Sequence, residues 1–394
     1  MNQTVRLGDV AFVNPKGPRA AEVNPEQLCD FVSMQALHGD GRIEIEEARP
    51  FRQVANGYTP FRSGDVLVAK ITSCFENGKI ALAETKTEYA FGSTEFHVVR
   101  GRDGVLDPRY LLHFLRLERI RAEGEGRMRC SAGQKRIPRS FLDDLEIPLP
   151  KIAEQQRITA ILDKAGDIGR KREQALALAD EIVRSTFLQE FGHPLDPSGR
   201  LERSELGVYC DLFAGNSLPK GKAFTGQDDG VFLVKVADLS APGNEVSVQS
   251  AKLWAPSRSA VRGGVLAPRA AVVFPKRGGA IATNNKRILG RDSILDPNLM
   301  AVAPKAYSHI SNQYLRTWFE LIDLTSISSG RSIPQLNKKD LALLPFGIPD
   351  RKAVEWFNEV YSFVDKLKTR LRVALKEADM MFASLSHSAF RGEL

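Results

Sequence analysis

The sequence predicts an α+β protein in which two α/β domains of similar size are separated by two long coiled-coil helices, so that the chain is an internal repeat. Two observations support this prediction. Two apolar stripes at helical spacing recur 199 positions apart, and short apolar runs bounded by glycine and proline precede each stripe in the same order. The expected segments are a first domain at 1–150, a central spacer helix at 151–193, a second domain at 194–349 and a C-terminal spacer helix at 350–394.

The two stripes run from Ile158 to Thr186 and from Phe357 to Leu385, in steps of three and four residues. Steps of this size place the side chains on one narrow face of an α-helix, as in the seam of a coiled coil, so the two stripes can bury each other. The seam is expected to contain Ile158, Ile161, Ile168, Ile182, Phe357, Val360, Val364, Leu367 and Leu371.

The two domains are predicted from short matching segments. Arg6-Leu7-Gly8 corresponds to Glu205-Leu206-Gly207, and Ile137-Pro138 is matched with Ile333-Pro334, 196 positions later. Each match alone is weak, but the matches follow a common order. The many Gly and Pro turns between them indicate α/β or β-rich domains with short strands and one or two helices each.

The formal net charge is +7, and most of it lies in the second domain, where residues 201–349 carry 18 basic and 12 acidic side chains. Such a surplus suits a polyanionic partner. The four cysteines are scattered and the histidines lack ligand spacing, so we expect reduced thiols and no metal site. The sequence begins without the apolar core of a signal peptide and has no apolar run of membrane-spanning length, so the expected location is the cytoplasm.

One motif resembles that of a known family. The run Ile147-Pro148-Leu149-Pro150-Lys151-Ile152-Ala153-Glu154-Gln155 is similar to the I-P-L-P-x-x-x-E-Q sequence that leads from a target recognition domain into a long helix in Type I restriction-modification specificity subunits. The ending Phe390-Arg391-Gly392-Glu393-Leu394 also resembles the family's, and the resemblance covers essentially the whole chain. The second copy of the motif, at 344–353, lacks the Glu-Gln pair.

This resemblance implies a non-catalytic subunit that binds double-stranded DNA. Each target recognition domain would read one half of a bipartite target in the major groove, and the two helices would pair antiparallel as a spacer, giving a pseudo-two-fold repeat. The helices would also dock two adenine methyltransferase subunits, with Glu154 and Gln155 as candidate contacts. Those partners would bind S-adenosylmethionine, and separate restriction and translocation subunits would use ATP and Mg²⁺, whereas this chain would bind no cofactor.

Base reading in DNA needs side chains that form paired hydrogen bonds, chiefly Arg or Lys to guanine and Asn or Gln to adenine, beside groups that anchor phosphates. Two loops of the first domain contain such residues. The candidates are Lys70, Thr72, Ser73, Asn77 and Lys79 in one loop, and Arg127, Arg129, Ser131, Gln134, Lys135 and Arg136 in the other. The second loop is either a solvated surface loop or a DNA contact. The resemblance favours DNA, because the family's recognition domains approach the duplex with a serine-glycine loop at this place.

The second domain contains matching loops. The candidates are Lys276, Arg277, Asn284, Asn285, Lys286, Arg287, Ser329, Arg331 and Ser332, with Lys220 and Lys222 as weaker candidates. Neighbouring glycines let the backbone approach phosphates closely, although Asn-Asn and Gly-Gly are also ordinary turn residues.

Two other classes of function remain as alternatives. One is a two-domain helical scaffold that binds protein partners rather than DNA. The other is an enzyme, which the sequence disfavours because it has no G-x-x-x-x-G-K-[ST] phosphate loop and no G-x-G-x-x-G dinucleotide fingerprint.

The predicted helix from Ala153 to Phe191 would be about 58 Å long, which exceeds one turn of B-DNA, about 34 Å. Inserting four residues after Ala177 should therefore change the length of DNA that the protein accepts between two half-sites. Binding to duplexes with half-sites at graded separations measures this preference. An unchanged preference would mean that the helices do not set the distance.

Overall fold

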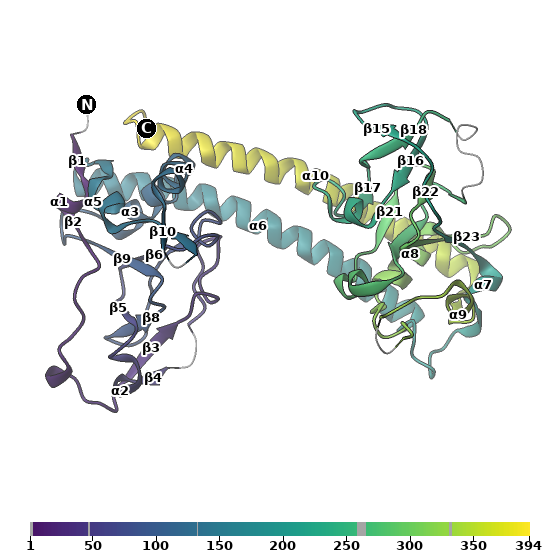
Figure 1. Ribbon diagram of the computed structural model, residues 1–394, viewed down its shortest axis with the longest axis horizontal. Helices are drawn as coiled ribbons and strands as arrows, with labels where there is room; N and C mark the ends of the chain where they lie inside the picture. The colour runs from purple at the N-terminus through teal and green to yellow at the C-terminus, as the bar shows by residue number, and fades with distance from the viewer. Residues whose placement is uncertain (1–2, 46–47, 132, 258–264, 331–332) are drawn as a thin grey trace. The chain divides into compact units, whose positions relative to one another are not determined.

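The structure, a computed structural model, describes residues 3–45, 48–131, 133–257, 265–330 and 333–394. The chain divides into two compact units, Met1–Glu173 with Val373–Leu394 and Gln174–Arg372. Each unit combines one domain with part of each long helix, α6 (Ile152–Phe191) and α10 (Arg351–Ala389), drawn in teal and yellow in Figure 1. The predicted α+β class with two long helices is confirmed. Across the described ranges, no helix combines the length and apolar character that a membrane crossing requires.

The first domain contains two four-stranded sheets. Its strands are β1 (Thr4–Arg6), β2 (Ala11–Val13), β3 (Leu28–Val32), β4 (Arg49–Pro50), β5 (Thr59–Phe61), β6 (Val66–Ala69), β7 (Ile80–Leu82), β8 (Ala90–Gly92), β9 (Phe96–Gly101), β10 (Arg129–Ser131), β11 (Gln134–Arg136) and β12 (Glu146–Pro148). Its helices are α1 (Leu7–Val10), η1 (Ala20–Glu22), α2 (Phe51–Val54), α3 (Pro108–Leu115), α4 (Glu118–Arg127) and α5 (Arg139–Asp144). One sheet has the antiparallel order β2-β9-β6-β7, and the other has the order β4-β3-β8-β5 with β3 parallel to β8. β1 pairs with β12, and β10 with β11.

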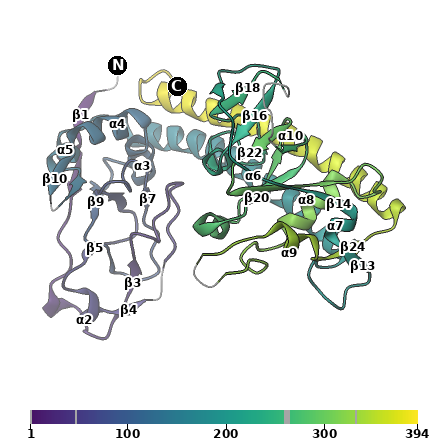
Figure 2. The same ribbon diagram turned by 45° about the vertical axis from the view of Figure 1, so that its right-hand side comes forward.

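The second domain contains two five-stranded sheets. Its strands are β13 (Glu202–Glu205), β14 (Cys210–Ala214), β15 (Lys222–Ala223), β16 (Val231–Val234), β17 (Ser247–Val248), β18 (Leu253–Ala255), β19 (Leu266–Ala267), β20 (Val272–Pro275), β21 (Arg287–Leu289), β22 (Ser293–Leu295), β23 (Leu299–Pro304) and β24 (Pro345–Ile348). The helices of its described residues are α7 (Leu206–Tyr209), η2 (Val236–Ser240), η4 (Gly278–Thr283), α8 (Asn312–Glu320) and α9 (Lys338–Ala342). The sheet orders are β14-β23-β20-β21-β17 and β15-β18-β16-β22-β19, and Figure 2 shows β18, β16 and β22 side by side. β13 pairs with β24.

The two domains share one plan, which confirms the predicted repeat. β2-β9-β6-β7 corresponds to β14-β23-β20-β21, and the parallel pair β3–β8 corresponds to β16–β22. At the entry to each domain, the amide of Leu7 donates to the carbonyl of Leu145 at 2.7 Å, and the amide of Leu206 donates to that of Leu344 at 3.0 Å. These equivalent bonds lie 199 positions apart, as do the two helical stripes.

The offset of 196 predicted from the two Ile-Pro pairs is wrong. The amide of Ile137 donates to the carbonyl of Lys70 at 2.9 Å, and the amide of Leu336 donates to that of Lys276 at 2.8 Å. Ile137 therefore corresponds to Leu336, 199 positions later, and not to Ile333. Burial agrees, because Ile137 and Leu336 are buried whereas Ile333 is 64% exposed. A dipeptide match contains too little information to set the register that backbone hydrogen bonds define.

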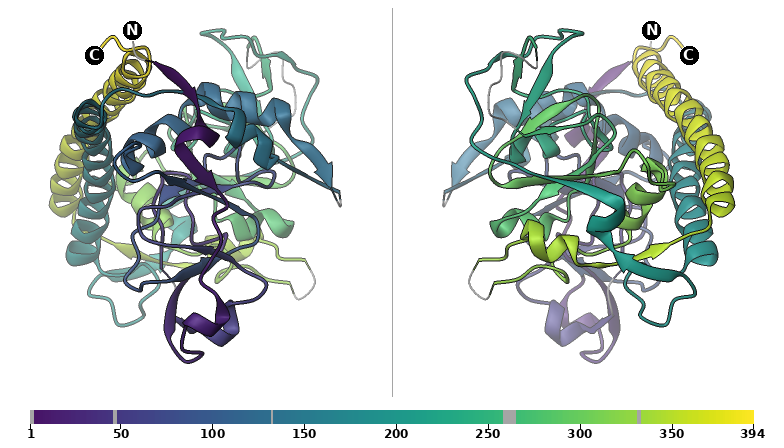
Figure 3. Two further views of the ribbon diagram at one scale, coloured as in Figure 1. Left: turned by 90° about the vertical axis from the view of Figure 1, so that its left-hand side faces the viewer. Right: turned by 90° about the vertical axis from the view of Figure 1, so that its right-hand side faces the viewer.

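Within each unit, the two long helices pack against each other. In the first unit, Ile158 near the start of α6 belongs to the same core as Ala389 at the end of α10. In the second unit, the rings of Phe187 near the end of α6 and Phe357 near the start of α10 are 5.5 Å apart. The start of one helix thus meets the end of the other in both units, which is the antiparallel pairing (Figures 1 and 3).

The seam of α6 differs from the predicted one. Ile168 and Ile182 are 38% and 48% exposed, and Ile161 is only partly buried. The buried apolar residues are Ile158, Leu162, Ala165, Ala179, Val183, Phe187 and Phe191. They follow the 3.6-residue period of a straight helix, whereas a strict heptad drifts by about 20° per seven residues away from the buried face. The seam residues predicted on α10 are buried at Phe357 and Val364, partly buried at Val360 and Leu371, and exposed at Leu367.

Aromatic rings anchor the C-terminal end of each long helix in a domain core. The ring of Phe390, directly after α10, lies 4.9 Å from that of Tyr110 and 5.6 Å from that of Phe114. The ring of Phe191, at the end of α6, lies 5.0 Å from that of Tyr314. Phe191 and Phe390 are both buried and are 199 positions apart, so the repeat extends to the last turn of each helix.

Replacing either ring, by Phe191→Ala or Phe390→Ala, should lower the free energy of unfolding by about 3–5 kcal/mol, because each change leaves a cavity in a packed core. Denaturant unfolding followed by circular dichroism measures the loss. Val373→Ala is the matched control on α10 and should change stability little, because Val373 is exposed. Losses as small as the control's in both Phe variants would show that these rings do not anchor the helices.

Candidate nucleic-acid interface

In the first domain, the loop with the most candidate residues is a hairpin made of β10 and β11. Its base is attached to the segment that leaves β6. The amide of Thr72 donates to the carbonyl of Lys135 at 2.9 Å, and the amide of Ile137 donates to that of Lys70 at 2.9 Å. The Thr72 hydroxyl donates to the same Lys135 carbonyl at 3.0 Å. The structure thus brings together two loops that are about 60 residues apart in the sequence.

Two side chains, Glu95 just before β9 and His97 within it, hold the base of the hairpin. Arg136 donates to the Glu95 carboxylate through Nε at 2.9 Å and Nη2 at 2.8 Å, and this pairing holds the pKa of Glu95 below its ordinary value. His97 Nε2 donates to the carbonyl of Ile137 at 3.0 Å, so its Nδ1 accepts from Asn14 Nδ2 at 3.0 Å. Burial lowers the pKa of His97, which favours the neutral ring that these bonds require. Arg136 is therefore paired with Glu95 and stabilises the base of the hairpin.

The second domain anchors its loop in the same way. The amide of Gly278 donates to the carbonyl of Pro334 at 2.8 Å, and the amide of Leu336 donates to that of Lys276 at 2.8 Å. These two bonds are equivalent to the two at the base of the hairpin. Their partners in the loop lie 199 positions after those in the first domain, and their partners after the strand lie 206 positions after. Each domain therefore presents one loop on an equivalent backbone frame.

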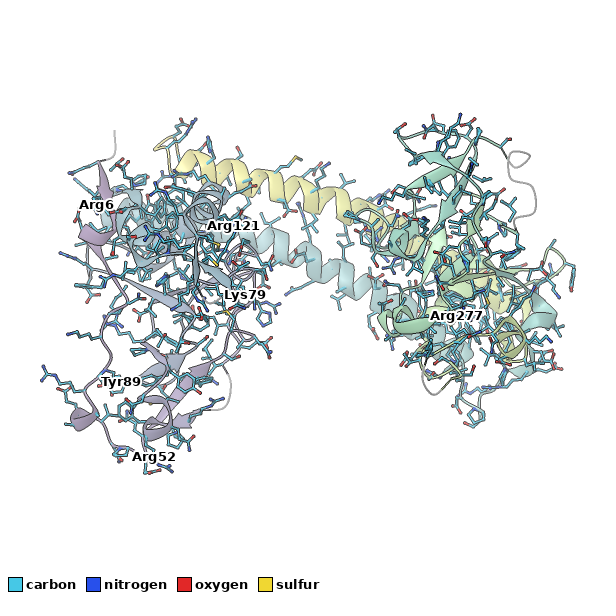
Figure 4. The ribbon with its side chains drawn as sticks, in the orientation of Figure 1. Arg6, Arg52, Lys79, Tyr89, Arg121 and Arg277 are labelled. Carbon is cyan, nitrogen blue, oxygen red and sulfur yellow. The ribbon has the colours of Figure 1, made fainter. Side chains whose placement is uncertain are left out.

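Polar side chains in the second loop are bonded within the loop. Arg277 Nη2 donates to Gln335 Oε1 at 3.3 Å, and the Ser329 hydroxyl donates to the Gln335 carbonyl at 3.1 Å. Arg277 is nevertheless exposed, and Figure 4 labels it in the second unit. Arg331 and Ser332, which were also predicted to contact DNA, lie outside the described residues.

Most other candidates in the first domain lie at the surface. Exposed positions are Thr72, Ser73, Asn77, Arg127, Arg129, Gln134 and Lys135, whereas Lys70 and Lys79 are half-buried. Lys79 Nζ donates to the carbonyl of Met34 at 2.8 Å, so this lysine (Figure 4) links two loops of the domain. The side chain of Ser131 is not among those described.

The cluster at 284–287 is bonded into the second domain. Arg287 Nε donates to the carbonyl of Leu239 at 3.1 Å, and Lys286 Nζ donates to that of Ile322 at 2.5 Å. Burial lowers the pKa of Lys286 to about 8. Together with α6, α8 and α10, these side chains line a cleft of about 480 Å³ inside the second unit. The cluster therefore has a structural role in the domain, and its contact with DNA stays a prediction.

The remaining candidates in this domain differ in their surroundings. Lys276 Nζ donates to the carbonyl of Gly215 at 3.3 Å, and burial lowers its pKa. Asn284 Oδ1 accepts from a backbone amide, and Asn285 Nδ2 donates to a serine hydroxyl of η2. Lys220 and Lys222 are exposed.

Gln155 is inaccessible to a partner, which corrects its predicted docking role. Its side chain is fully buried in the first unit, where Oε1 accepts from the amide of Asp107 at 2.8 Å. Its Nε2 donates to the carbonyls of Val105 and Pro150, both at 2.9 Å. Both N–H donors and one lone pair of the amide oxygen are thus used. These bonds join the start of α6 to the segment before α3. Glu154 lies closer to the surface, so docking there stays a prediction.

No local pattern in the sequence marks Glu95 or His97 as part of the site. Their partners in the hairpin are 41 and 40 positions away along the chain. Glu95 precedes a buried strand and His97 lies within it, positions at which sequence alone predicts a turn residue and a core residue.

Comparison with known proteins finds relatives of this chain. Residues 2–177 match the Type I restriction modification DNA specificity domain. The chain is 39% identical over 203 residues to the Type I restriction enzyme EcoAI specificity subunit of Escherichia coli, and 37% identical over 163 residues to the EcoEI specificity subunit of the same species. Residues 2–177 are therefore similar to the DNA specificity domain of Type I restriction-modification specificity subunits. These alignments span 49% and 41% of this chain but only 32% and 27% of the two relatives.

Two solved structures share the fold of this chain. One is a chain from a structure of the type I R-M system, described as the structural basis underlying its complex assembly and conformational transition. It is 20% identical to this chain, with a TM-score of 0.61, and the match covers 100% of this chain and 98% of that one. The other, the S subunit of the Type-I restriction-modification system from M. genitalium, is 14% identical and covers 98% and 96%, with a TM-score of 0.53. The shared fold therefore extends beyond residues 2–177 to the second unit.

Glu95→Gln should loosen the hairpin, because a neutral amide cannot pair with the charge of Arg136. Hydrogen exchange at the amides of Thr72 and Ile137 should become about ten-fold faster, as expected for the loss of a charge-assisted hydrogen bond. The pH dependence follows from the lowered pKa of Glu95. Its stabilisation is fully present above the ordinary value of 4.5 and is lost as the pH falls through the lower folded value, so the wild type should loosen in acid and the variant should show no such step.

The matched control is Glu123→Gln. Glu123 lies 3.9 Å from Arg127 in an exposed pair on α4, which contributes little to stability. Equal exchange rates in the wild type and both variants would show that Glu95 does not stabilise the hairpin.

Proposed function

We propose that the chain is the DNA sequence-specificity subunit of a Type I restriction-modification complex. Each domain would read one half of a bipartite target with its anchored loop, and the helix pair would set the distance between the half-sites. The observation that carries the proposal is the pair of loops, which stand on equivalent backbone hydrogen bonds in the two domains of a specificity-subunit fold. The relatives named above are specificity subunits of Type I restriction enzymes, which supports the same conclusion.

The exposed side chains of the hairpin suit DNA. Gln134 Oε1 accepts from Arg136 Nη2 at 3.4 Å and keeps a second lone pair, so Gln134 can still form the paired hydrogen bonds that adenine offers in the major groove. Arg129, which is exposed, can form those that guanine offers. Lys135 and the exposed residue Ser73 beside its base would anchor phosphates. Because the base of the hairpin is already ordered, less conformational entropy is lost on binding than for an unanchored loop.

The long helices would dock two adenine methyltransferase subunits, with restriction and translocation subunits as further partners. Large apolar side chains are exposed on both helices in the second unit, at Leu178 and Ile182 of α6 and at Trp356 and Phe363 of α10. Exposed apolar residues in such number favour a protein partner. S-adenosylmethionine, ATP and Mg²⁺ would be bound by the partner subunits in the cytoplasm, and this chain would contribute recognition without catalysis.

The test is binding of duplex DNA by the chain together with its methyltransferase. The target sequence comes from mapping methylated adenines in the host genome. The logarithm of the binding constant should fall linearly with the logarithm of the salt concentration, and Lys135→Ala should reduce the slope by about 1 through loss of one phosphate contact. Lys366→Ala removes an exposed charge from α10 and is the control, expected to leave the slope unchanged.

A scaffold that binds only proteins would leave the duplex unbound at every salt concentration. Methylation or cleavage of DNA by the isolated chain would contradict a non-catalytic role. Specific binding with a steep salt dependence and no turnover by the isolated chain is the expected result.

A further inference from the structure

The two anchored loops have different residues at one equivalent position. The carbonyls of Lys135 and Pro334 accept the equivalent hydrogen bonds that attach each loop to its domain. The residues just before them, Gln134 and Ile333, therefore occupy the same position in the two loops, 199 positions apart. A polar amide in the first loop is replaced by a branched aliphatic side chain in the second.

Backbone contacts hold the described residues of the second loop, 328–330 and 333–335. Ser329 and Gln335 close the loop with two backbone hydrogen bonds of 2.9 and 2.8 Å. Gly330 has φ +101°, and a Cβ there would lie 2.5 Å from the carbonyl oxygen of Ile333, so the two sides of the loop approach too closely for any other residue. The Ile333 side chain, in contrast, is 64% exposed and belongs to none of the apolar cores formed by the described residues of this domain.

The polar side chains beside Ile333 are already bonded within the protein. Gln335 Oε1 accepts from Arg277, and Gln335 Nε2 donates to Asn337 Oδ1. The Ser329 hydroxyl donates to the Gln335 carbonyl. One donor and one acceptor lone pair of the Gln335 amide are therefore already used within the protein. Among the described residues of this loop, Ile333 offers the large side chain that is open to a ligand.

An aliphatic side chain recognises a base through its methyl group. In the major groove thymine presents a C5-methyl group, whereas cytosine, adenine and guanine present hydrogen-bonding groups at their edges. Burying one methyl group increases affinity about four-fold. An isoleucine placed against a polar base edge gains no such contact and leaves the polar groups of that edge unpaired.

We propose that Ile333 reads the C5-methyl group of a thymine in the half-site of the second domain; this proposal rests on the proposed function. At the same position, the first domain presents the amide of Gln134, which suits adenine. One exchanged side chain on a shared frame would then make the two half-sites different in sequence.

The test is equilibrium binding of the complex with its methyltransferase to duplexes in which single thymines are replaced by deoxyuridine, which lacks only the methyl group. The half-site of the second domain is assigned from the bases that change when residues 194–349 are exchanged for those of another family member. In the wild type, one such replacement should lower the affinity about four-fold. Ile333→Ala should bind the thymine and deoxyuridine duplexes equally well.

Two further variants sharpen the test. Ile333→Val keeps a branched aliphatic group and should retain part of the response to deoxyuridine. Gln134→Ala changes the equivalent position of the other loop and should weaken binding to the thymine and deoxyuridine duplexes alike, so their affinity ratio should stay as in the wild type. Ile333 is exposed, so Ile333→Ala is expected to unfold at the wild-type temperature, which thermal unfolding checks.

Specific binding in which no thymine on either strand of this half-site responds to deoxyuridine would overturn the proposal for Ile333 and leave the proposed function intact. A response that persists undiminished in Ile333→Ala would do the same. Failure of the wild-type complex to bind DNA specifically would instead overturn the proposed function.

Discussion

The burial of helix residues in the domain cores is the constraint on which the rest of the structure depends. In the first unit, residues of α6 and α10 share one core with β-strands and α3, and in the second unit other residues of the same helices share a core with α8. Phe187 and Phe191 pack on Tyr314 as Phe390 packs on Tyr110. Long helices gain most of their stability from such packing rather than from intrinsic propensity. Each domain and the helix segments beside it therefore form one hydrophobic unit.

The second constraint is the backbone frame beneath each loop. The base of one loop is defined by hydrogen bonds that the Lys70 carbonyl accepts and the Thr72 amide donates. The base of the other is defined by bonds that the Lys276 carbonyl accepts and the Gly278 amide donates. The same frame carries the hairpin of β10 and β11 in the first domain and a loop closed by Ser329 and Gln335 in the second. Because the frame depends mainly on main-chain atoms, side chains at the loop tips can change without altering the fold. Under the proposed function, this separation would allow the two halves to recognise different sequences.

The long helices and the internal repeat were predictable because a single helix shows its buried face in the spacing of its own apolar residues. The prediction was wrong where it assumed a strict heptad: Ile168 and Ile182 lie off the buried face, and Val183 lies on it. It was also wrong where a two-residue match, Ile137-Pro138 with Ile333-Pro334, was used to align the loops. Both errors arose from short patterns that several three-dimensional registers can satisfy.

By itself, the sequence determined the fold class, the two helices, the duplication and, through the Ile147–Gln155 motif, the similarity of residues 2–177 to Type I specificity domains. These features depend on periodicity and on residues close together along the chain. Only the tertiary structure decided that Gln155 is buried, that Arg136 is paired with Glu95 and that Lys286 is bonded inside its domain. The partners in these contacts are 36 to 48 positions away, and the availability of a polar side chain to DNA or protein depends on whether such a distant partner already uses its hydrogen bonds.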